Sequence, residues 1–334
     1  MSLTKENRES AKHYLLELIS RKEPNIVKRT MEAYSVSKVT VYKYLRDLME
    51  NEILEKNGGV YSLHHVIDNT YEYRISEDIS EDGIYTNDLR PDLDGISDNS
   101  LHIWEYAISE MINNVIDHSE TEIFFVRIIK DYLNTTVIIK DNGIGIFKKI
   151  ANYYKYPSLD HAVEELFKGK LTTNAQNHSG EGIFFTSRVM DLYAAVSSGK
   201  CFTHNKFSDV FVQLDEELID QGTMVYMRLA NNTNKTLRSI FDEYADVDGG
   251  FTKTRIPIRN FFETYPVSRS QAKRLTRRFE DFKEVVLDFE GIADIGQGFA
   301  HELFVVYVKA HPEVMLLMVN TNENIQRMIY HVTH

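Results

Sequence analysis

The sequence predicts a multidomain α+β protein, and three observations lead to this prediction. The chain has 334 residues, which is longer than a domain with a single hydrophobic core usually is, and 43% of the residues are hydrophobic, as in folded proteins. Helix-like and strand-like apolar patterns follow one another along most of its length. Residues 1–65 hold 11 Lys and Arg against 9 Asp and Glu, whereas residues 66–334 hold 27 against 41. We therefore expect two or three domains with different surface charge.

Residues 1–66 are expected to form three helices and a β-hairpin. The expected helices cover residues 9–20, 25–34 and 39–51, and the hairpin covers 53–63 with an Asn-Gly-Gly turn. Residues 36–48 are similar to the recognition helices of bacterial regulators, and the segment resembles a winged helix-turn-helix. That resemblance implies DNA contacts from Lys38, Thr40, Tyr42, Lys43 and Arg46. Because the net charge is only +2, protein contacts remain the alternative, and DNA binding is expected to be weak unless the protein dimerises.

The next segment is acidic. Residues 71–98 carry nine Asp and Glu against two Arg, with Pro91 and several turn residues. We expect residues 67–98 to be a connector that packs on the following domain. The lone Cys201 allows no internal disulfide, and no apolar run is long enough to cross a bilayer. These features favour a cytoplasmic protein without membrane contact.

Two polar side chains are expected one turn apart on a helix that starts near residue 98. Glu110 and Asn114 interrupt the apolar series that runs from Ile103 to Val115. A carboxylate that activates water, beside an amide oxygen that ligates a hard cation, suits phosphate chemistry. A solvated helix face is the alternative for this pair alone.

Three later segments fit the same pocket. Asp141 ends an expected strand and precedes Gly143 and Gly145, whose missing side chains allow close approach of a ligand, although an ordinary turn has the same pattern. Gly180 and Gly182 open a helix, where free N–H groups favour phosphate. The other candidates are lysines of the expected lid at residues 146–179 and a hydroxyl that begins a strand: Lys168, Lys170 and Thr223.

In this order the four segments resemble the nucleotide-binding motifs of the GHKL ATPase superfamily, which includes gyrase, histidine kinases and a heat-shock chaperone. Residues 113–119 look most like its anti-sigma-factor branch. The resemblance implies a Bergerat-type α/β sandwich over residues 99–230 that binds ATP and Mg²⁺. It also implies a catalytic base at Glu110, a metal ligand at Asn114 and an adenine partner at Asp141, with the glycines forming the lid hinges and the phosphate cradle.

Beyond a linker at residues 231–251, strands and helices alternate, which predicts a small α/β domain over residues 252–334. Residues 268–275 and 286–300 resemble an uncharacterised STAS-like domain that often follows a GHKL module. STAS domains carry a phosphorylatable serine after a strand, but this chain has Ile295-Gly296-Gln297-Gly298 there. The basic helix at 268–283 is expected either to clamp an anionic ligand or to dock on the acidic body of the molecule.

Three functions remain open from the sequence. The first is a signalling regulator in which Mg-ATP switches the winged helix and the STAS-like domain. The second is an ATPase or an anti-sigma-type protein serine/threonine kinase that uses Glu110. The third is a DNA-binding transcription regulator that senses ATP. The expected partners are ATP, DNA through residues 1–66, a protein through the STAS-like domain, and a second copy of the chain.

Overall fold

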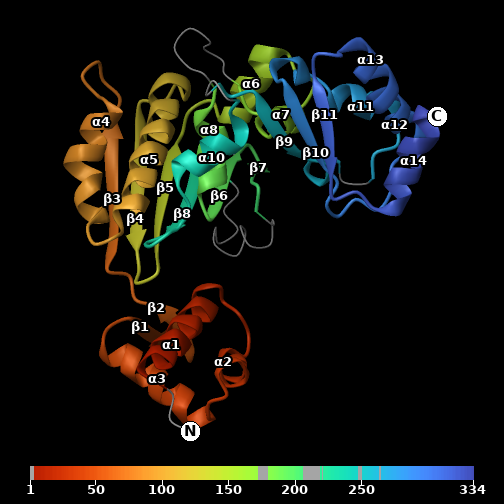
Figure 1. The fold of residues 1–334 in the computed structure, drawn as a ribbon. Coiled ribbons are helices and arrows are strands. Elements are labelled where there is room, and N and C mark those ends of the chain that lie inside the picture. Colours follow the sequence, from red (N-terminus) through yellow and green to blue (C-terminus); the bar gives the residue numbers. More distant parts are fainter. Residues whose placement is uncertain (1–3, 172–179, 206–218, 220, 247–249, 263–264) are drawn as a thin grey trace. The chain divides into compact units, whose positions relative to one another are not determined.

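The computed structural model describes residues 4–171, 180–205, 219, 221–246, 250–262 and 265–334 (Figure 1). These residues form a mixed α+β structure with a two-stranded, a three-stranded and a six-stranded sheet, in agreement with the predicted fold class. The chain divides into two compact units. One contains residues 1–109, 122–140 and 226–234, and the other contains residues 110–121, 141–225 and 235–334. Among the described residues, no helix combines the length and apolarity of a membrane span.

The N-terminal segment has the three helices and the hairpin expected from the sequence. They are α1 Lys5–Ser20, α2 Ile26–Tyr34, α3 Lys38–Glu50, β1 Leu54–Asn57 and β2 Val60–Leu63. The hydroxyl of Ser37 accepts a hydrogen bond from the backbone N–H of Thr40 and so caps α3. Leu15, Val41 and Leu45 are almost fully buried in one core beneath the hairpin. Apolar side chains at helical spacing thus account for the packing of this segment.

The six-stranded sheet has the order β3-β4-β5-β8-β6-β7. Its strands are β3 Ile67–Arg74, β4 Ile123–Lys130, β5 Asn134–Asp141, β6 Leu192–Ser197, β7 Lys200–Phe202 and β8 Met224–Ala230. We expected residues 67–74 to belong to a connector, but β3 instead pairs with β4 along its whole length as an antiparallel edge strand. Since its side chains are exposed or half-buried, polar residues are tolerated in this strand.

The rest of the acidic segment is helical and packs on β3. It contains α4 Glu81–Ile84, a π-helical turn at Tyr85–Leu89 and a 3₁₀ turn at Arg90–Leu93. The buried carboxylate of Asp92 accepts hydrogen bonds from the Asn69 amide and the Tyr71 hydroxyl, at 2.9 and 2.8 Å. A polar network within the acidic segment thus fixes its helical part on β3, which the negative charge alone did not indicate.

The middle of the chain contributes the longest helix. The helices here are α5 Asp98–His118, α6 Ile146–Tyr154, α7 Leu159–Leu166, α8 Gly182–Val189 and α10 Leu237–Tyr244. In α5, Trp104, Ala107 and Ile108 have no exposed surface. Residues 231–251, expected to be a linker, contain α10, which packs against α8.

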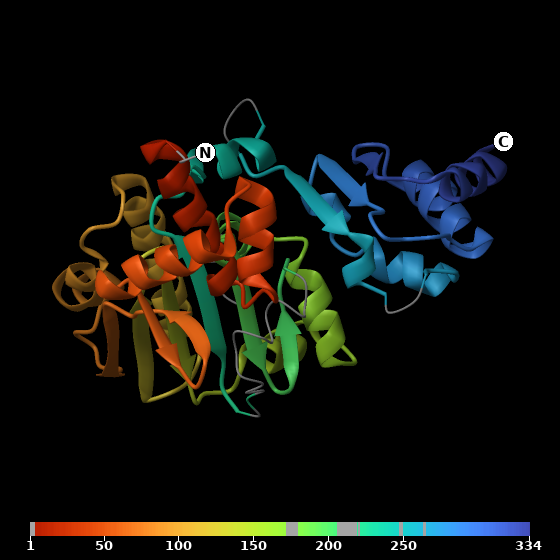
Figure 2. The same cartoon turned by 90° about the horizontal axis from the view of Figure 1, so that it is seen from below.

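The C-terminal sheet is parallel, with the order β11-β10-β9. Its strands are β9 Lys253–Pro257, β10 Glu284–Asp288 and β11 Met315–Val319, and its helical segments are Ile258–Asn260, α11 Arg269–Leu275, Phe279–Asp281, α12 Gln297–His301, Glu302–Tyr307, α13 Val308–Ala310 and α14 Glu323–Thr333. Figures 1 and 2 both show α11, α12 and α14 along one side of the three strands. Ile256, Val285 and Leu287 are fully buried there. The predicted alternation of strand and helix is confirmed.

Candidate functional site

Glu110 and Asn114 lie one turn apart on α5, as their spacing predicted. Both side chains are half-buried. The α5 helix begins where Ser97 caps the backbone N–H of Ser100 at 3.2 Å, and its apolar stripe fixes its rotation. The part of the chain that the structure describes provides no hydrogen-bond partner for the Asn114 amide.

Asp141 ends β5 and is only 3% exposed. One carboxylate oxygen accepts a hydrogen bond from the Gly143 N–H at 2.8 Å, and the backbone N–H of Asp141 donates to the Thr223 carbonyl at 3.0 Å. Burial raises the pKa of the Asp141 carboxyl, while the backbone N–H groups of Gly143 and Thr223 oppose that rise. A buried carboxylate with fixed geometry suits the recognition of a single donor group.

Thr223 joins the start of β8 to the loop after Asp141. Its hydroxyl oxygen accepts a hydrogen bond from the Ile146 N–H at 2.9 Å. That N–H belongs to the first residue of α6, so the bond also satisfies an otherwise free helix N–H group. The structure therefore brings the second and fourth sequence motifs together.

Three glycines allow these segments to touch backbone to backbone. A Cβ on Gly143 would lie 1.8 Å from the Ser119 carbonyl oxygen, and one on Gly222 would lie 2.0 Å from the Asp141 carbonyl oxygen. Gly145 has φ +87° and faces the Ser197 hydroxyl, which a Cβ would approach to 2.5 Å. Real Cβ contacts this short do not occur, so only glycine fits at each position.

The third motif reaches Glu110. A Cβ on Gly182, the first residue of α8, would lie 2.0 Å from a carboxylate oxygen of Glu110. Gly180 has φ +71° and packs on the backbone of Leu171. A Cβ on Gly180 would lie 2.7 Å from the backbone nitrogen of Leu171. The lid residues 172–179 lie outside the described residues. Glu110 and Gly182 thus form one set of contacts, and Asp141, Gly222 and Thr223 form another.

Lys168 and Lys170 are engaged elsewhere, which differs from their expected role at a nucleotide. Lys168 is fully buried and donates hydrogen bonds to a Glu165 carboxylate oxygen and the Arg277 carbonyl, both at 2.7 Å. Lys170 donates to the Asp281 carbonyl at 2.9 Å. Burial lowers the pKa of both ammonium groups. Because the C-terminal sheet region holds both side chains, we leave them out of the candidate site.

Arg278 belongs to the basic segment at 268–283, and the sequence alone did not indicate its partners. Its guanidinium donates to the carbonyls of Gly169 and Lys170, at 3.0 and 2.6 Å, and forms ion pairs with Glu165 and Asp281. The side chain is only 16% exposed. These contacts bind residues 167–171, which we call the strap, to the C-terminal region. Glu165, Gly169 and Lys170 lie more than a hundred positions from Arg278 in the sequence, so no local pattern indicates these contacts.

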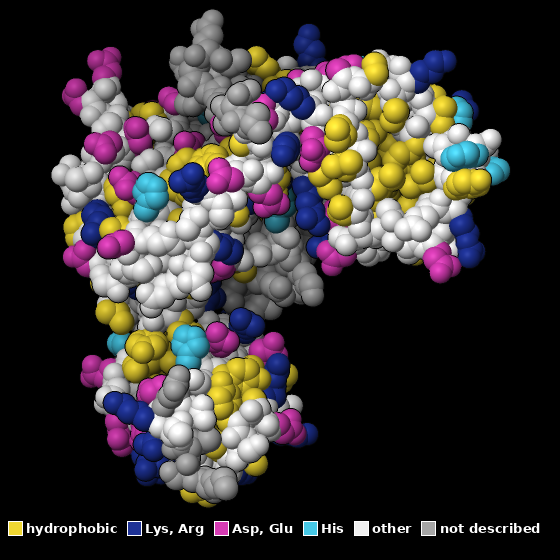
Figure 3. All heavy atoms as spheres, viewed as in Figure 1, with side chains coloured by type: hydrophobic (Ala, Val, Ile, Leu, Met, Phe, Trp, Pro, Cys, Tyr) yellow, Lys and Arg dark blue, Asp and Glu magenta, His cyan; other side chains and the backbone are white. Residues whose placement is uncertain are grey.

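On α3, the residues expected to contact DNA lie mainly on the outer face. Lys38, Tyr42, Lys43 and Arg46 are exposed, while Thr40 is half-buried next to the Ser37 hydroxyl. Within the described part of the chain, the three basic side chains have no carboxylate at ion-pair distance. Figure 3 shows Lys and Arg side chains on the surface of this N-terminal segment, interspersed with Asp and Glu.

Comparison with known proteins identifies one part of the chain. Residues 271–326 match the family described as a STAS-like domain of unknown function (DUF4325). The match covers α11 through β11 and the beginning of α14, which includes two strands of the parallel sheet. No curated protein matches the chain. The C-terminal region therefore contains a STAS-like domain.

Proposed function

We propose that the chain is a signalling regulator that binds Mg-ATP at the site around Glu110 and Asp141 and transmits occupancy of this site to its STAS-like domain. The observation that supports the site most strongly is the packing of Gly182 on the Glu110 carboxylate, because it joins a helix N-terminus to a candidate base. The packing of Gly143 and Gly222 around Asp141 supports the other end of the site.

Each polar group has a role that its chemistry suits. The ionised Asp141 carboxylate accepts a hydrogen bond from the exocyclic amine of adenine, and Thr223 helps to hold the surrounding loop. The N–H groups at the start of α8 face the phosphates, and the Asn114 amide oxygen would hold Mg²⁺. When bound, magnesium would neutralise part of the negative charge of the triphosphate. Glu110 then accepts a proton from the attacking water or hydroxyl.

The strap provides the link to the STAS-like domain. Its Leu171 touches Gly180, next to the proposed phosphate cradle, while Gly169 and Lys170 are bonded to Arg278. The Thr254 hydroxyl of β9 also donates to the Lys168 carbonyl at 2.8 Å. A change in the backbone around Gly180 on nucleotide binding therefore acts directly on residues held by the C-terminal sheet.

Hydrogen exchange of the full chain tests this proposal. We expect a non-hydrolysable ATP analogue with Mg²⁺ to slow amide exchange at residues 180–182 and to change exchange in the strap and around Arg278. Protection at the cradle without any change in the strap would contradict the link to the STAS-like domain. No protection at either place would contradict the nucleotide site.

Radiolabelled ATP separates the enzymatic alternatives. Released phosphate identifies an ATPase, and label on a protein in a cell extract identifies a kinase of the anti-sigma type. If neither product forms although nucleotide binds, ATP acts only as a switching ligand. In all three cases Glu110→Gln serves as the matched control, because it removes the base and keeps the shape of the side chain.

DNA binding through the N-terminal segment is a second candidate function, favoured by the outer face of α3. Lys43 and Arg46 lie one turn apart on this face, and both are exposed. Val39, the second residue of the helix, is 78% exposed. Such a face offers both phosphate contacts and an apolar contact for a thymine methyl group. Selection of binding sites from random DNA tests it, and a selection that enriches no sequence would reassign α3 to protein contacts.

A further inference from the structure

A cavity lies in the unit that contains the STAS-like domain, and the proposed nucleotide site does not use the residues that line it. Its volume is about 340 Å³. Pro257 and Asp288, the last residues of β9 and β10, line it together with Arg188 near the end of α8. Ligands of open parallel sheets commonly bind outside the carboxyl ends of the strands. Position and size therefore both fit a small-molecule site.

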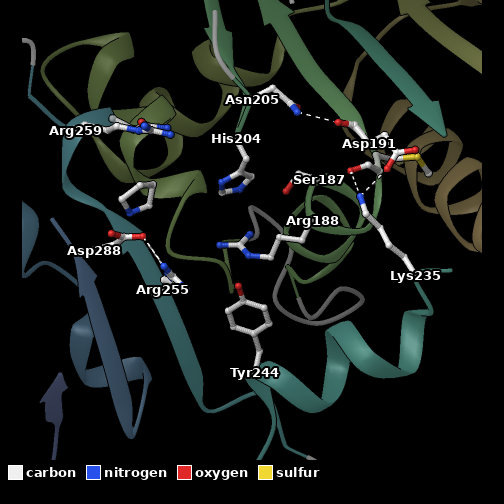
Figure 4. A pocket seen from close by; sticks show the side chains of 13 residues that line it. Ser187, Arg188, Asp191, His204, Asn205, Lys235, Tyr244, Arg255, Arg259 and Asp288 are labelled. Atoms are coloured by element: carbon white, nitrogen blue, oxygen red, sulfur yellow. Dashed lines mark hydrogen bonds and ion pairs between the residues drawn. The ribbon is translucent and has the colours of Figure 1, made fainter. Parts of the chain in front are cut away.

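The cavity carries a surplus of positive charge. Four basic side chains line it, against the two carboxylates of Asp191 and Asp288. Lys235 pairs with Asp191 at 2.8 Å, and Arg255 pairs with Asp288 at 2.7 Å (Figure 4). The other two basic side chains are Arg188 and Arg259. Neither has a described carboxylate at ion-pair distance, although Tyr244 and the charge of Glu243 favour the charged form of Arg188. Among the side chains that line the cavity, four basic groups face two carboxylates, a surplus of two positive charges.

Contacts with α8 and with the strap hold the Arg188 side chain in position. Its guanidinium donates to the carbonyls of Phe184 and Phe167, at 3.1 and 3.2 Å, and lies 3.3 Å from the centre of the Phe184 ring. The Ser187 hydroxyl donates to the same Phe184 carbonyl at 2.9 Å. These bonds satisfy the Phe184 carbonyl, so that this acceptor is not left free to repel an anion. A charged group fixed in this way is pre-organised for binding.

Two further donor groups have no partner within the described ranges. Arg259 is exposed, makes no hydrogen bond or ion pair there, and extends toward His204 in Figure 4. The Nε2 atom of His204 is buried without a hydrogen-bond partner. Burial and the neighbouring Arg188 lower the pKa of the His204 imidazole, which keeps the ring neutral and able to donate one N–H. A buried nitrogen without a partner is costly, and a ligand would satisfy it.

We propose that this cavity binds a small phosphorylated molecule through the phosphate group, with Arg188, Arg259 and His204 as its donors. A phosphate monoester carries close to two negative charges, which matches the surplus of two positive charges. Guanidinium groups bind phosphate oxygens through paired N–H donors. The cavity has room beyond a phosphate, and Tyr244 lines it with an aromatic ring that suits an organic substituent.

Calorimetric titration of the full chain with phenyl phosphate tests the site. Arg259→Gln removes an exposed donor and leaves the core untouched, so we expect the variant to fold and to bind phenyl phosphate about tenfold more weakly or worse. Arg269→Gln is the matched control, since it removes the same charge from an exposed position on α11 away from the cavity. It should keep the affinity of the unaltered chain.

Asn114→Ala distinguishes this cavity from the proposed nucleotide site. Binding that persists in Asn114→Ala and is weakened in Arg259→Gln supports the proposal. Binding that is weakened in Asn114→Ala alone places phenyl phosphate at the nucleotide site and overturns it. Equal losses in Arg259→Gln and Arg269→Gln, or no saturable binding by the unaltered chain, overturn it as well.

Discussion

Replacing Gly143 by alanine tests the backbone contacts around Asp141. The new Cβ would lie 1.8 Å from the Ser119 carbonyl oxygen. The segments that contain Gly143 and Ser119 must therefore separate by about 1.2 Å before the distance between these two atoms reaches 3.0 Å. The Ile144 N–H bonds the same oxygen at 2.8 Å, and this separation breaks that bond. The hydrogen bond from the Gly143 N–H to the Asp141 carboxylate is disturbed as well. Loss of these two hydrogen bonds should lower the free energy of unfolding by about 2 kcal/mol.

The same displacement moves the Asp141 carboxylate, and we expect the affinity for a non-hydrolysable Mg-ATP analogue to fall by tenfold or more. Urea denaturation measures the first effect, and calorimetry at a temperature where the variant is folded measures the second. Gly250→Ala is the control, because its nearest neighbour would be 3.6 Å away. Unchanged stability and affinity in Gly143→Ala would refute the packing that we describe.

Three other predictions concern the site and the strap. Glu110→Gln should keep nucleotide affinity and lower any turnover by at least a hundredfold, measured as phosphate release, whereas equal turnover would exclude Glu110 as the base. Affinity for the ATP analogue should fall as the pH is lowered, starting above the ordinary aspartate pKa of about 3.9, because the raised pKa of Asp141 allows it to protonate earlier and lose its acceptor oxygen. A pH-independent affinity would contradict this role. Arg278→Met should lower the free energy of unfolding by about 3 kcal/mol in urea denaturation, since the strap carbonyls lose their donor and, of its described partners, the buried Glu165 carboxylate keeps only Lys168. A loss below about 1 kcal/mol would show that the strap is held by other contacts.

Local sequence patterns predicted most of the secondary structure. The alternation expected over residues 252–334 includes β11 Met315–Val319 and the terminal helix α14, which begins at Glu323. The strand is a short unbroken apolar run, and Asn322 caps the helix by accepting a hydrogen bond from the Ile325 N–H at 3.0 Å. The strand β3 was missed because its acidic and turn-rich surroundings suggested a connector. Its pairing with β4 depends on residues some sixty positions away.

The site could be predicted only where each segment carries its own signal. Glycines in fixed order indicated Gly143, Gly180 and Gly182, but not the carbonyls and carboxylate they touch. Lys168 was expected at the nucleotide because nothing near it in the sequence shows the buried network of Glu165 and Arg278. The basic helix at 268–283 left two interpretations open. In the structure Arg274 pairs with Glu164 at 3.2 Å, which favours docking on the same molecule.

Calorimetric titration of the full chain with a non-hydrolysable ATP analogue, with and without Mg²⁺, tests the central claim most directly. We predict saturable binding that Mg²⁺ strengthens, and we predict that Asn114→Ala keeps the fold but loses the effect of Mg²⁺. Absence of saturable binding, or the same gain from Mg²⁺ in Asn114→Ala as in the unaltered chain, would contradict the proposed nucleotide site.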